Sequence, residues 1–221
     1  MKEAPNLPTP SIRSMTLQPL HFYFDFISPY GYFASLRIDD LANRHGRSVQ
    51  WHPMLLGVSV MKVMGLKPLL DTPLKGPYTA RDVRRYARLH GIALGRAPDA
   101  PMMNPLTAGR TFAWAKRHRP DSSKALAQAM LHAYWHDGID LSEPAALLAI
   151  ALPAPVLATV TAANLVAAAQ SPEAAQLLRD EVDASLKAGV FGSPTVVVDG
   201  EVFWGIDKFS ELEHWLATGG W

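Results

Sequence analysis

Hydrophobic and polar residues alternate along 20–27, which read Leu-His-Phe-Tyr-Phe-Asp-Phe-Ile. A period of two is typical of a β-strand, and it places the three phenylalanines on one face and His21, Tyr23 and Asp25 on the other. A second short strand is predicted from Val49 to Pro53.

A helix is predicted between these strands. Ser28-Pro29-Tyr30 is a typical helix start, because serine is a favoured N-cap and proline at the first helical position gives up no needed N–H. Apolar residues at Phe33, Leu36 and Leu41 extend one helix to about Gly46. The strand–helix–strand unit should place two parallel strands side by side.

From about Gly57 to Gly189 we find no convincing strand. Helical spacing, Ala-rich composition and Gly or Pro boundaries favour helices throughout this stretch. The predicted ranges are 79–90, 105–118, 122–136, 142–152, 161–169 and 172–187.

The end of the chain returns to β-structure. Residues 195–198 form an apolar strand, Asp199-Gly200 is typical of a two-residue hairpin turn, and 201–204 is the partner strand. A last helix is predicted at 208–217. The order β-α-β, helices, β-β-α predicts an α/β thioredoxin fold with a large all-helical insertion.

This order also predicts the organisation of the chain. We expect a thioredoxin-like domain made of 20–56 and 190–221, with an inserted helical domain at 57–189. Residues 1–19 are rich in Pro, Ser and Thr and are expected to be a disordered leader, within which Met15 is a candidate start.

Composition narrows the chemistry. The chain has 221 residues, a formal net charge of +1 and no cysteine. A disulfide, a thiolate metal site and a thiol nucleophile are therefore excluded, and the charge gives no reason to expect a nucleic acid. There is no apolar run of 18 residues, so we expect no membrane span. The N-terminus lacks the apolar core of a secretory signal, and we expect a cytoplasmic protein.

Several segments, taken in order, resemble one known family. They are Asp25-Phe26-Ile27-Ser28-Pro29-Tyr30, then Lys67-Pro68, then Lys75-Gly76-Pro77-Tyr78 followed by Arg81-Asp82, then Phe191-Gly192-Ser193-Pro194-Thr195, and finally Trp204-Gly205-Ile206-Asp207-Lys208. Together they are similar to the motifs of 2-hydroxychromene-2-carboxylate isomerases and kappa-class glutathione transferases, which belong to the DsbA-like thioredoxin superfamily. The resemblance spans roughly residues 20–217.

The resemblance implies glutathione as cofactor. Ser28 would stabilise its thiolate, where related oxidoreductases carry a cysteine; from the residues alone Ser28 is a helix N-cap. Ser193 would pair with the cysteinyl backbone beside a cis Pro194, although the residues alone favour an ordinary trans proline that opens an edge strand. Ile206 and Asp207 would hold the γ-glutamyl end, and Asp207 is also a reasonable helix cap.

The resemblance also implies cations for carboxylates. Lys75 is expected to bind glutathione, and Lys67 and Arg81 are candidates for the substrate carboxylate. Leu66 stands where the family has asparagine, which puts the identity of the substrate in doubt. Asn104 is a candidate replacement for that amide.

The implied activity is interconversion of 2-hydroxychromene-2-carboxylate and trans-o-hydroxybenzylidenepyruvate, or of a related small aromatic carboxylate, by reversible thiolate addition. Two alternatives stay open: a kappa-like transferase or peroxidase, and an inactive thioredoxin-like binding module. By analogy with the family, the protein is expected to be a homodimer.

One further motif remains outside this function. His132 and His136 lie four residues apart on one predicted helix, a spacing that can bind a metal. The sequence shows no evident third ligand and no glutamate in the arrangement of a metalloprotease. We therefore expect no metal site.

Overall fold

A computed structural model describes residues 17–221. Residues 1–16, which include Met15 and most of the predicted leader, lie outside the described residues. Within the described part, no helix combines the length and apolar character that crossing a membrane requires.

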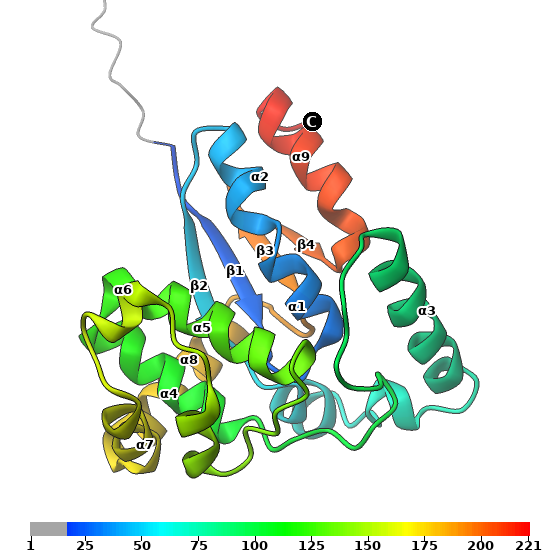
Figure 1. The fold of residues 1–221 in the computed structure, drawn as a ribbon. Coiled ribbons are helices and arrows are strands. Elements are labelled where there is room, and N and C mark those ends of the chain that lie inside the picture. The colour runs from blue at the N-terminus through cyan, green and yellow to red at the C-terminus, as the bar shows by residue number, and fades with distance from the viewer. Residues whose placement is uncertain (1–16) are drawn as a thin grey trace, which may run out of the picture.

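A mixed sheet with the order β2-β1-β3-β4 forms the centre of the molecule (Figure 1). The strands are β1 (Leu20–Phe24), β2 (Val49–Pro53), β3 (Thr195–Val198) and β4 (Glu201–Trp204). β1 pairs in parallel with β2 and antiparallel with β3, so Phe22 lies between Trp51 and Val196. The first strand and the C-terminal hairpin are thus neighbours in the sheet although the whole insertion separates them in sequence.

The first helical region differs from the prediction. The chain forms two helices, α1 (Pro29–Ser35) and α2 (Ile38–Arg44), instead of one helix to Gly46. Leu36 lies in the break and is 44% exposed, whereas Ile38 is fully buried. The break lets Ile38 turn into the core. In a continuous helix with Leu36 on its apolar face, Ile38 would point away from the core.

The insertion consists only of helices in the described chain, as predicted. Its elements are a π-helix η1 (Gly57–Val63), a 3-10 helix η2 (Leu69–Asp71), α3 (Lys75–Leu89), α4 (Leu106–His118), α5 (Pro120–Trp135), a 3-10 helix η3 (Pro144–Ala149), α6 (Ala154–Leu157), α7 (Ala162–Gln170) and α8 (Pro172–Lys187). In Figure 1, α4 to α8 gather at one end of the sheet. A 3-10 helix η4 (Ile206–Lys208) and α9 (Phe209–Thr218) follow the hairpin.

Two predicted helices of the insertion have other bounds. The helix predicted at 142–152 is the shorter η3, which ends at Ala149 because the backbone becomes extended at Ile150, where ψ is 131°. α3 begins at Lys75, before the predicted start at Thr79, because Gly76 lets the helix start approach the carbonyl of Leu70. A side chain at Gly76 would collide with that carbonyl.

The buried core runs without a break from the sheet into the insertion. Phe24 contacts Phe112 of α4 with ring centroids 5.4 Å apart. The buried Trp135 of α5 donates a hydrogen bond of 2.9 Å from Nε1 to the carbonyl of Phe26. The insertion therefore supports the segment that leads from β1 to Ser28.

Candidate active site

Ser28 occupies the N-cap of α1 and is 3% exposed. Its Oγ accepts a hydrogen bond from Gly31 N at 3.0 Å, so the sequence-based assignment as a cap is confirmed. The hydroxyl also donates to the carbonyl of Ser193 at 2.9 Å. Ser28 thus joins the start of α1 to a loop far away in sequence, as the resemblance implied.

The Ser193 loop lies directly against the start of α1. The peptide bond between Ser193 and Pro194 is cis, as the resemblance implied. Ser193 Oγ accepts a hydrogen bond of 2.9 Å from Asp25 N. A Cβ at Gly31 would lie 2.7 Å from that same Oγ, so glycine at this position permits the close approach of helix and loop.

Two backbone donors remain available at this junction. Within residues 17–221, neither Ser193 N–H nor Tyr30 N–H donates a hydrogen bond to another group. The N–H of Ser193 suits the backbone carbonyl of a bound cysteinyl residue, and the N–H of Tyr30 belongs to the first turn of α1, where it suits an anion. This set of donors fits the peptide and thiolate groups of glutathione.

Asp25 lies beneath Ser28 and is fully buried. Its Oδ2 accepts from Leu56 N at 2.7 Å and its Oδ1 from Ile27 N at 3.2 Å. Burial raises the pKa of Asp25 to about 6, although these backbone N–H groups act in the opposite direction. At neutral pH the site therefore contains a negative charge close to Ser28, a feature that the sequence analysis did not identify.

The residues predicted to hold the γ-glutamyl end come to the same loop. Gly205 N donates to Pro194 O at 2.9 Å, and η4, which contains Ile206 and Asp207, contacts α1. Gly205 has φ +105°, a conformation that favours glycine, and the Asp207 carboxylate folds back over it. The structure thus brings Ser28, Ser193, Pro194 and the 206–207 pair together.

The three predicted cations lie in and after the loop that precedes α3. Lys67, Lys75 and Arg81 are exposed, and within residues 17–221 none of them forms an ion pair. Tyr30 connects this region to α1, since its hydroxyl donates to Asp82 Oδ2 at 2.6 Å. Lys75 begins α3 itself.

Asn104 has a structural role at the start of α4. Its Oδ1 accepts from Leu106 N at 3.1 Å, and its N–H donates to Ser142 Oγ at 2.9 Å. Its amide oxygen is therefore already used within the chain, and a role for Asn104 toward substrate stays a prediction. Leu66 is 57% exposed.

Two aromatic side chains flank the Ser193 loop without having been singled out from the sequence. Phe191 and Trp204 are 39% and 53% exposed, with ring centroids 4.8 Å apart. Gly192 lies against the indole of Trp204, so closely that a side chain at 192 would collide with it. Both residues belong to motif segments that resemble the known family, and this membership could have indicated that they lie at the site.

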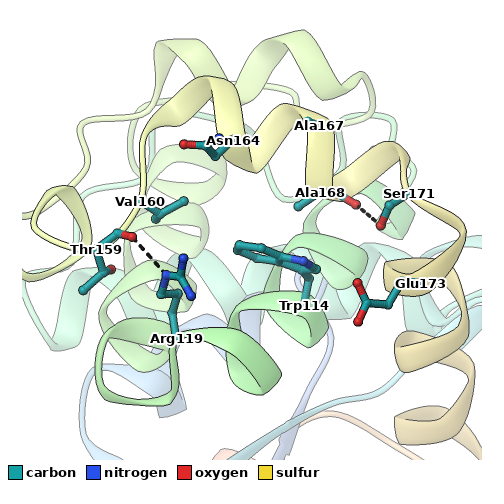
Figure 2. A pocket seen from close by; sticks show the side chains of 9 residues that line it. All are labelled: Trp114, Arg119, Thr159, Val160, Asn164, Ala167, Ala168, Ser171 and Glu173. Atoms are coloured by element: carbon teal, nitrogen blue, oxygen red, sulfur yellow. Dashed lines mark hydrogen bonds between the residues drawn. The ribbon is translucent and has the colours of Figure 1, made fainter.

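A cavity of about 330 Å³ lies elsewhere, within the insertion (Figure 2). Figure 2 shows Trp114 of α4 at its centre, with Arg119 on one side and Glu173 on the other. Arg119 Nε donates to Thr159 O at 3.0 Å. None of the predicted site residues lines this cavity.

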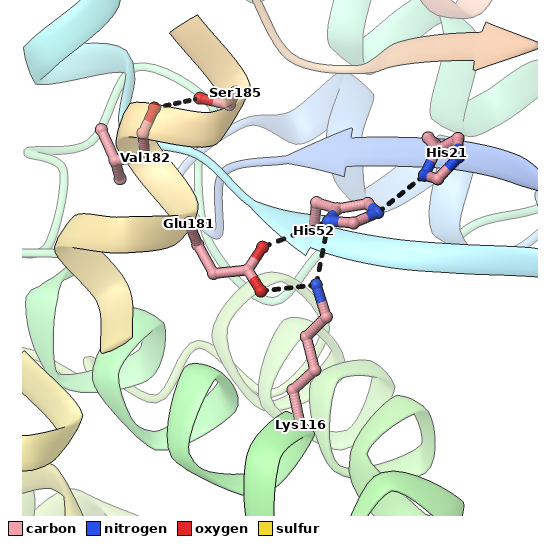
Figure 3. A network of polar contacts seen from close by, with 6 residues as sticks. All are labelled: His21, His52, Lys116, Glu181, Val182 and Ser185. Carbon is pink, nitrogen blue, oxygen red and sulfur yellow. Dashed lines mark hydrogen bonds and ion pairs between the residues drawn. The ribbon is translucent and has the colours of Figure 1, made fainter. Parts of the chain in front are cut away.

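A polar network joins the sheet to the insertion (Figure 3). His21 Nδ1 and His52 Nε2 are 3.1 Å apart across β1 and β2, and His52 Nδ1 lies 3.1 Å from Glu181 Oε2 on α8. Lys116 of α4 donates to Glu181 Oε1 at 2.6 Å. Tyr23 stacks on His52 with a centroid distance of 4.7 Å. We refer to His21, His52, Lys116 and Glu181 as the histidine network.

Known proteins resemble the chain over most of its length. The 2-hydroxychromene-2-carboxylate isomerase of Sphingobium xenophagum is 27% identical over 205 residues, which cover 89% of this chain and 97% of that protein. Glutathione S-transferase kappa 1 of Homo sapiens is 26% identical over 206 residues and 90% of each chain. A solved structure of a 2-hydroxychromene-2-carboxylate isomerase has a TM-score of 0.71 at 23% identity, and the match covers 90% of this chain and 94% of that one.

The family model described as DSBA-like thioredoxin domain matches residues 19–217. This chain therefore belongs to the DSBA-like thioredoxin domain family, as the order of its elements and its motifs predicted.

Proposed function

We propose that the chain is a glutathione-dependent isomerase that interconverts 2-hydroxychromene-2-carboxylate and trans-o-hydroxybenzylidenepyruvate or a related aromatic catabolite. The observation that carries the proposal is the contact between Ser28 Oγ and the carbonyl of Ser193, at the junction of a helix start and a cis-proline loop. The chain has no cysteine, so a sulfur nucleophile at this junction has to come from a ligand. The isomerase and kappa relatives support glutathione as that ligand.

Glutathione would supply a thiolate that adds reversibly to the conjugated double bond, which permits rotation about that bond. Ser28 would turn its hydroxyl hydrogen from Ser193 O to the sulfur, while its Oγ keeps the bond from Gly31 N. Hydrogen bonds to a charged acceptor are the strong kind, and this one holds the sulfur ionised and oriented. Asp207 would meet the γ-glutamyl ammonium, and Lys75 a glutathione carboxylate.

The segment before and at the start of α3 supports an aromatic carboxylate as substrate. Large apolar side chains are concentrated there on the surface, at Met61, Val63, Met64, Leu66, Leu69, Leu74 and Tyr78. Exposed cations at Lys67 and Lys75 lie in the same stretch, with Arg81 just after it. Apolar surface with nearby cations matches a flat ring that bears a carboxylate. We assign the apolar residues of this segment, together with Lys67 and Arg81, to the substrate, while Lys75 stays with glutathione.

The activity is tested by adding 2-hydroxychromene-2-carboxylate to the purified full chain and following its absorbance with and without reduced glutathione. We expect interconversion that requires glutathione and leaves the free-thiol concentration unchanged. Loss of free thiol during turnover would instead identify a kappa-like transferase or peroxidase. If calorimetry detected no glutathione binding to the folded protein, the binding-module alternative would replace the proposal.

Replacing Ser28 by Ala should weaken turnover. A hydrogen bond to a charged group contributes about 1.5–3 kcal/mol, so kcat/KM is expected to fall roughly 10- to 100-fold. Ser28→Thr keeps a hydroxyl and should retain more activity. Ser35→Ala is a matched control, because Ser35 is also buried on α1 but donates only to Tyr32 O. Equal activity of Ser28→Ala and the control would remove Ser28 from the mechanism.

A further inference from the structure

The last turn of α5 brings three potential metal ligands together on the surface. His132 and His136 stack with ring centroids 4.1 Å apart. Asp137 faces both rings, with its Oδ1 2.8 Å from His136 Nδ1 and its Oδ2 3.4 Å from His132 Nδ1. One ligand atom from each residue lies within 4.8 Å of the others. The sequence showed the two histidines four residues apart, and the fold adds the third ligand.

The backbone holds these residues in place. The carbonyl of His132 accepts from both His136 N at 2.7 Å and Asp137 N at 3.1 Å. The chain then leaves the helix through Gly138, which has φ +75°, and Ile139 N donates to Ala133 O at 2.9 Å. This is the hydrogen-bonding pattern of a helix C-cap, and it fixes Asp137 beside the histidines without any ligand. The position of the third donor is therefore set by the fold of the helix end.

The electrostatic setting favours a cation. The last carbonyl groups of a helix carry partial negative charge, and Asp137 adds a full one. The side chains of His132, His136 and Asp137 are 50%, 42% and 37% exposed, so solvent reaches the cluster and water can complete a coordination sphere. Two imidazole nitrogens and one carboxylate oxygen are a donor set that suits zinc, whereas magnesium prefers oxygen ligands.

We propose that His132, His136 and Asp137 form a binding site for Zn²⁺. Ligand atoms around a tetrahedral zinc ion are about 3.4 Å apart when the metal–ligand distances are about 2.1 Å. Each histidine already lies at or below this distance from one oxygen of Asp137, and one ligand atom from each of the three residues lies within 4.8 Å of the others. Binding therefore needs side-chain rotations that draw the donors together by up to about 1.4 Å, together with loss of the protons now donated to Asp137. The ion would cross-link side chains at the C-terminal end of α5 and would take no part in the chemistry at Ser28.

The test is calorimetric titration of the tag-free full chain with Zn²⁺ at neutral pH. We expect one equivalent to bind, and we expect His136→Ala and Asp137→Asn each to weaken binding by at least roughly tenfold. Loss of even an outer-sphere partner of a metal ligand typically costs 10–100-fold. Mg²⁺ should give no comparable binding. His118→Ala is the matched control, because His118 is a half-exposed helical histidine that pairs with Glu173 elsewhere.

Thermal unfolding gives a second readout. Since a ligand that binds only the folded state stabilises it, Zn²⁺ should raise the Tm of the wild type and of His118→Ala but not of His136→Ala or Asp137→Asn. Asp137→Asn preserves the shape of the side chain, so it keeps the test informative if His136→Ala perturbs the helix end. Absence of binding by the wild type, or equal affinity in all four proteins, would overturn the site.

Discussion

Asp25 keeps a carboxylate out of contact with solvent, next to the residue proposed to hold a thiolate. The carboxylate accepts two backbone N–H groups, from Leu56 and Ile27, and so ties the segment after β2 to the turn before α1. These bonds do not fully replace water, and the pKa of Asp25 is therefore raised to about 6. Its charge also opposes a second negative charge nearby, which would make the affinity for a thiolate depend on pH.

The raised pKa has a consequence for stability with a definite sign. The folded protein binds the Asp25 proton more tightly than the unfolded chain, so the stability due to this group is complete below pH 3.8 and is lost as the pH rises through about 6. The shift of about two units corresponds to about 3 kcal/mol. Asp25→Asn mimics the protonated carboxyl, and we expect it to be more stable than the wild type at pH 8 by up to this amount and similar to it at pH 4.

Denaturant unfolding across this pH range measures the effect. The exposed Asp183→Asn variant is a control that removes a carboxylate without removing a buried one. If the free energy of unfolding changed with pH in the same way for Asp25→Asn and the wild type, the buried carboxylate would not have the assigned pKa.

At the scale of single residues, the local roles of side chains could be predicted from the sequence, but their burial in the folded protein could not. Ser28 as an N-cap followed from its neighbour Pro29, and the cis bond at Pro194 followed from the family motif. The burial of Asp25 could not be derived, because alternation only assigns it to the face opposite the phenylalanines. The insertion and the segment after β2 cover that face as well, and nothing in 20–27 shows it.

At the scale of elements, the histidine network joins four parts of the fold. β1, β2, α4 and α8 each contribute one side chain to it. Burial lowers the pKa of His21, and the charges of His52 and Lys116 act in the same direction. Burial also lowers the pKa of Lys116, while Glu181 opposes that shift. The network thus favours the neutral form of His21 between the sheet and the insertion.

This preference predicts how stability responds to mild acid. A histidine whose pKa is lowered in the folded state contributes stability above its unfolded value of 6.5, and this stability is lost as the pH falls below that value. His21→Gln cannot titrate, so its stability should fall less than that of the wild type between pH 7 and 5. Circular dichroism during urea unfolding at the two pH values provides the comparison, with the exposed His90→Gln as control. If the free energy of unfolding of His21→Gln fell as much as that of the wild type between pH 7 and 5, this account of the network would be wrong.

Boundaries of elements were predicted well where local residues determine them. The hairpin turn at Asp199-Gly200 has both residues at positive φ, as such turns require. The break between α1 and α2 was missed because it depends on burying Ile38 under the sheet, which is a tertiary demand. The shorter 3-10 helix at 144–149 was missed because the pattern of residues 142–152 does not show that the backbone becomes extended at Ile150.

At the scale of the whole molecule, the proposed site unites the two ends of the described chain. Ser28 and Ser193 belong to opposite sides of the insertion, yet they are joined by a direct hydrogen bond. The order of elements predicted that the two halves share one fold, and the family resemblance, not the topology alone, implied this meeting of Ser28 with the Ser193 loop. Exposed apolar residues between η1 and α3 were not predictable, because their number depends on which helix faces pack. The expected homodimer stays a prediction, which sedimentation of the full chain would test.

Ligand binding should therefore lower amide hydrogen exchange near Ser28 and near Ser193 at the same time. Addition of reduced glutathione is expected to slow amide hydrogen exchange at residues 28–31 and 192–207 at once, because their N–H groups become bonded or shielded. Mass spectrometry of exchanged peptides measures this, with α7 as an internal reference that should not respond. Protection of only one of the two segments would mean that the ligand does not bridge them.

Under the proposed function, the hydrogen bond from Ser28 to the Ser193 carbonyl would also influence which thiols bind. In the free protein this donor and this acceptor satisfy each other, so an entering thiol must replace both halves of the bond. A peptide thiol offers an anion to the hydroxyl and an N–H to the carbonyl, whereas a simple alkyl thiol offers only the anion. Because an ordinary hydrogen bond contributes about 0.5–1.5 kcal/mol, a simple alkyl thiol would bind roughly 2- to 10-fold more weakly than a peptide thiol at this one contact. The contact at Ser28 would then select for a peptide backbone as well as for a thiol.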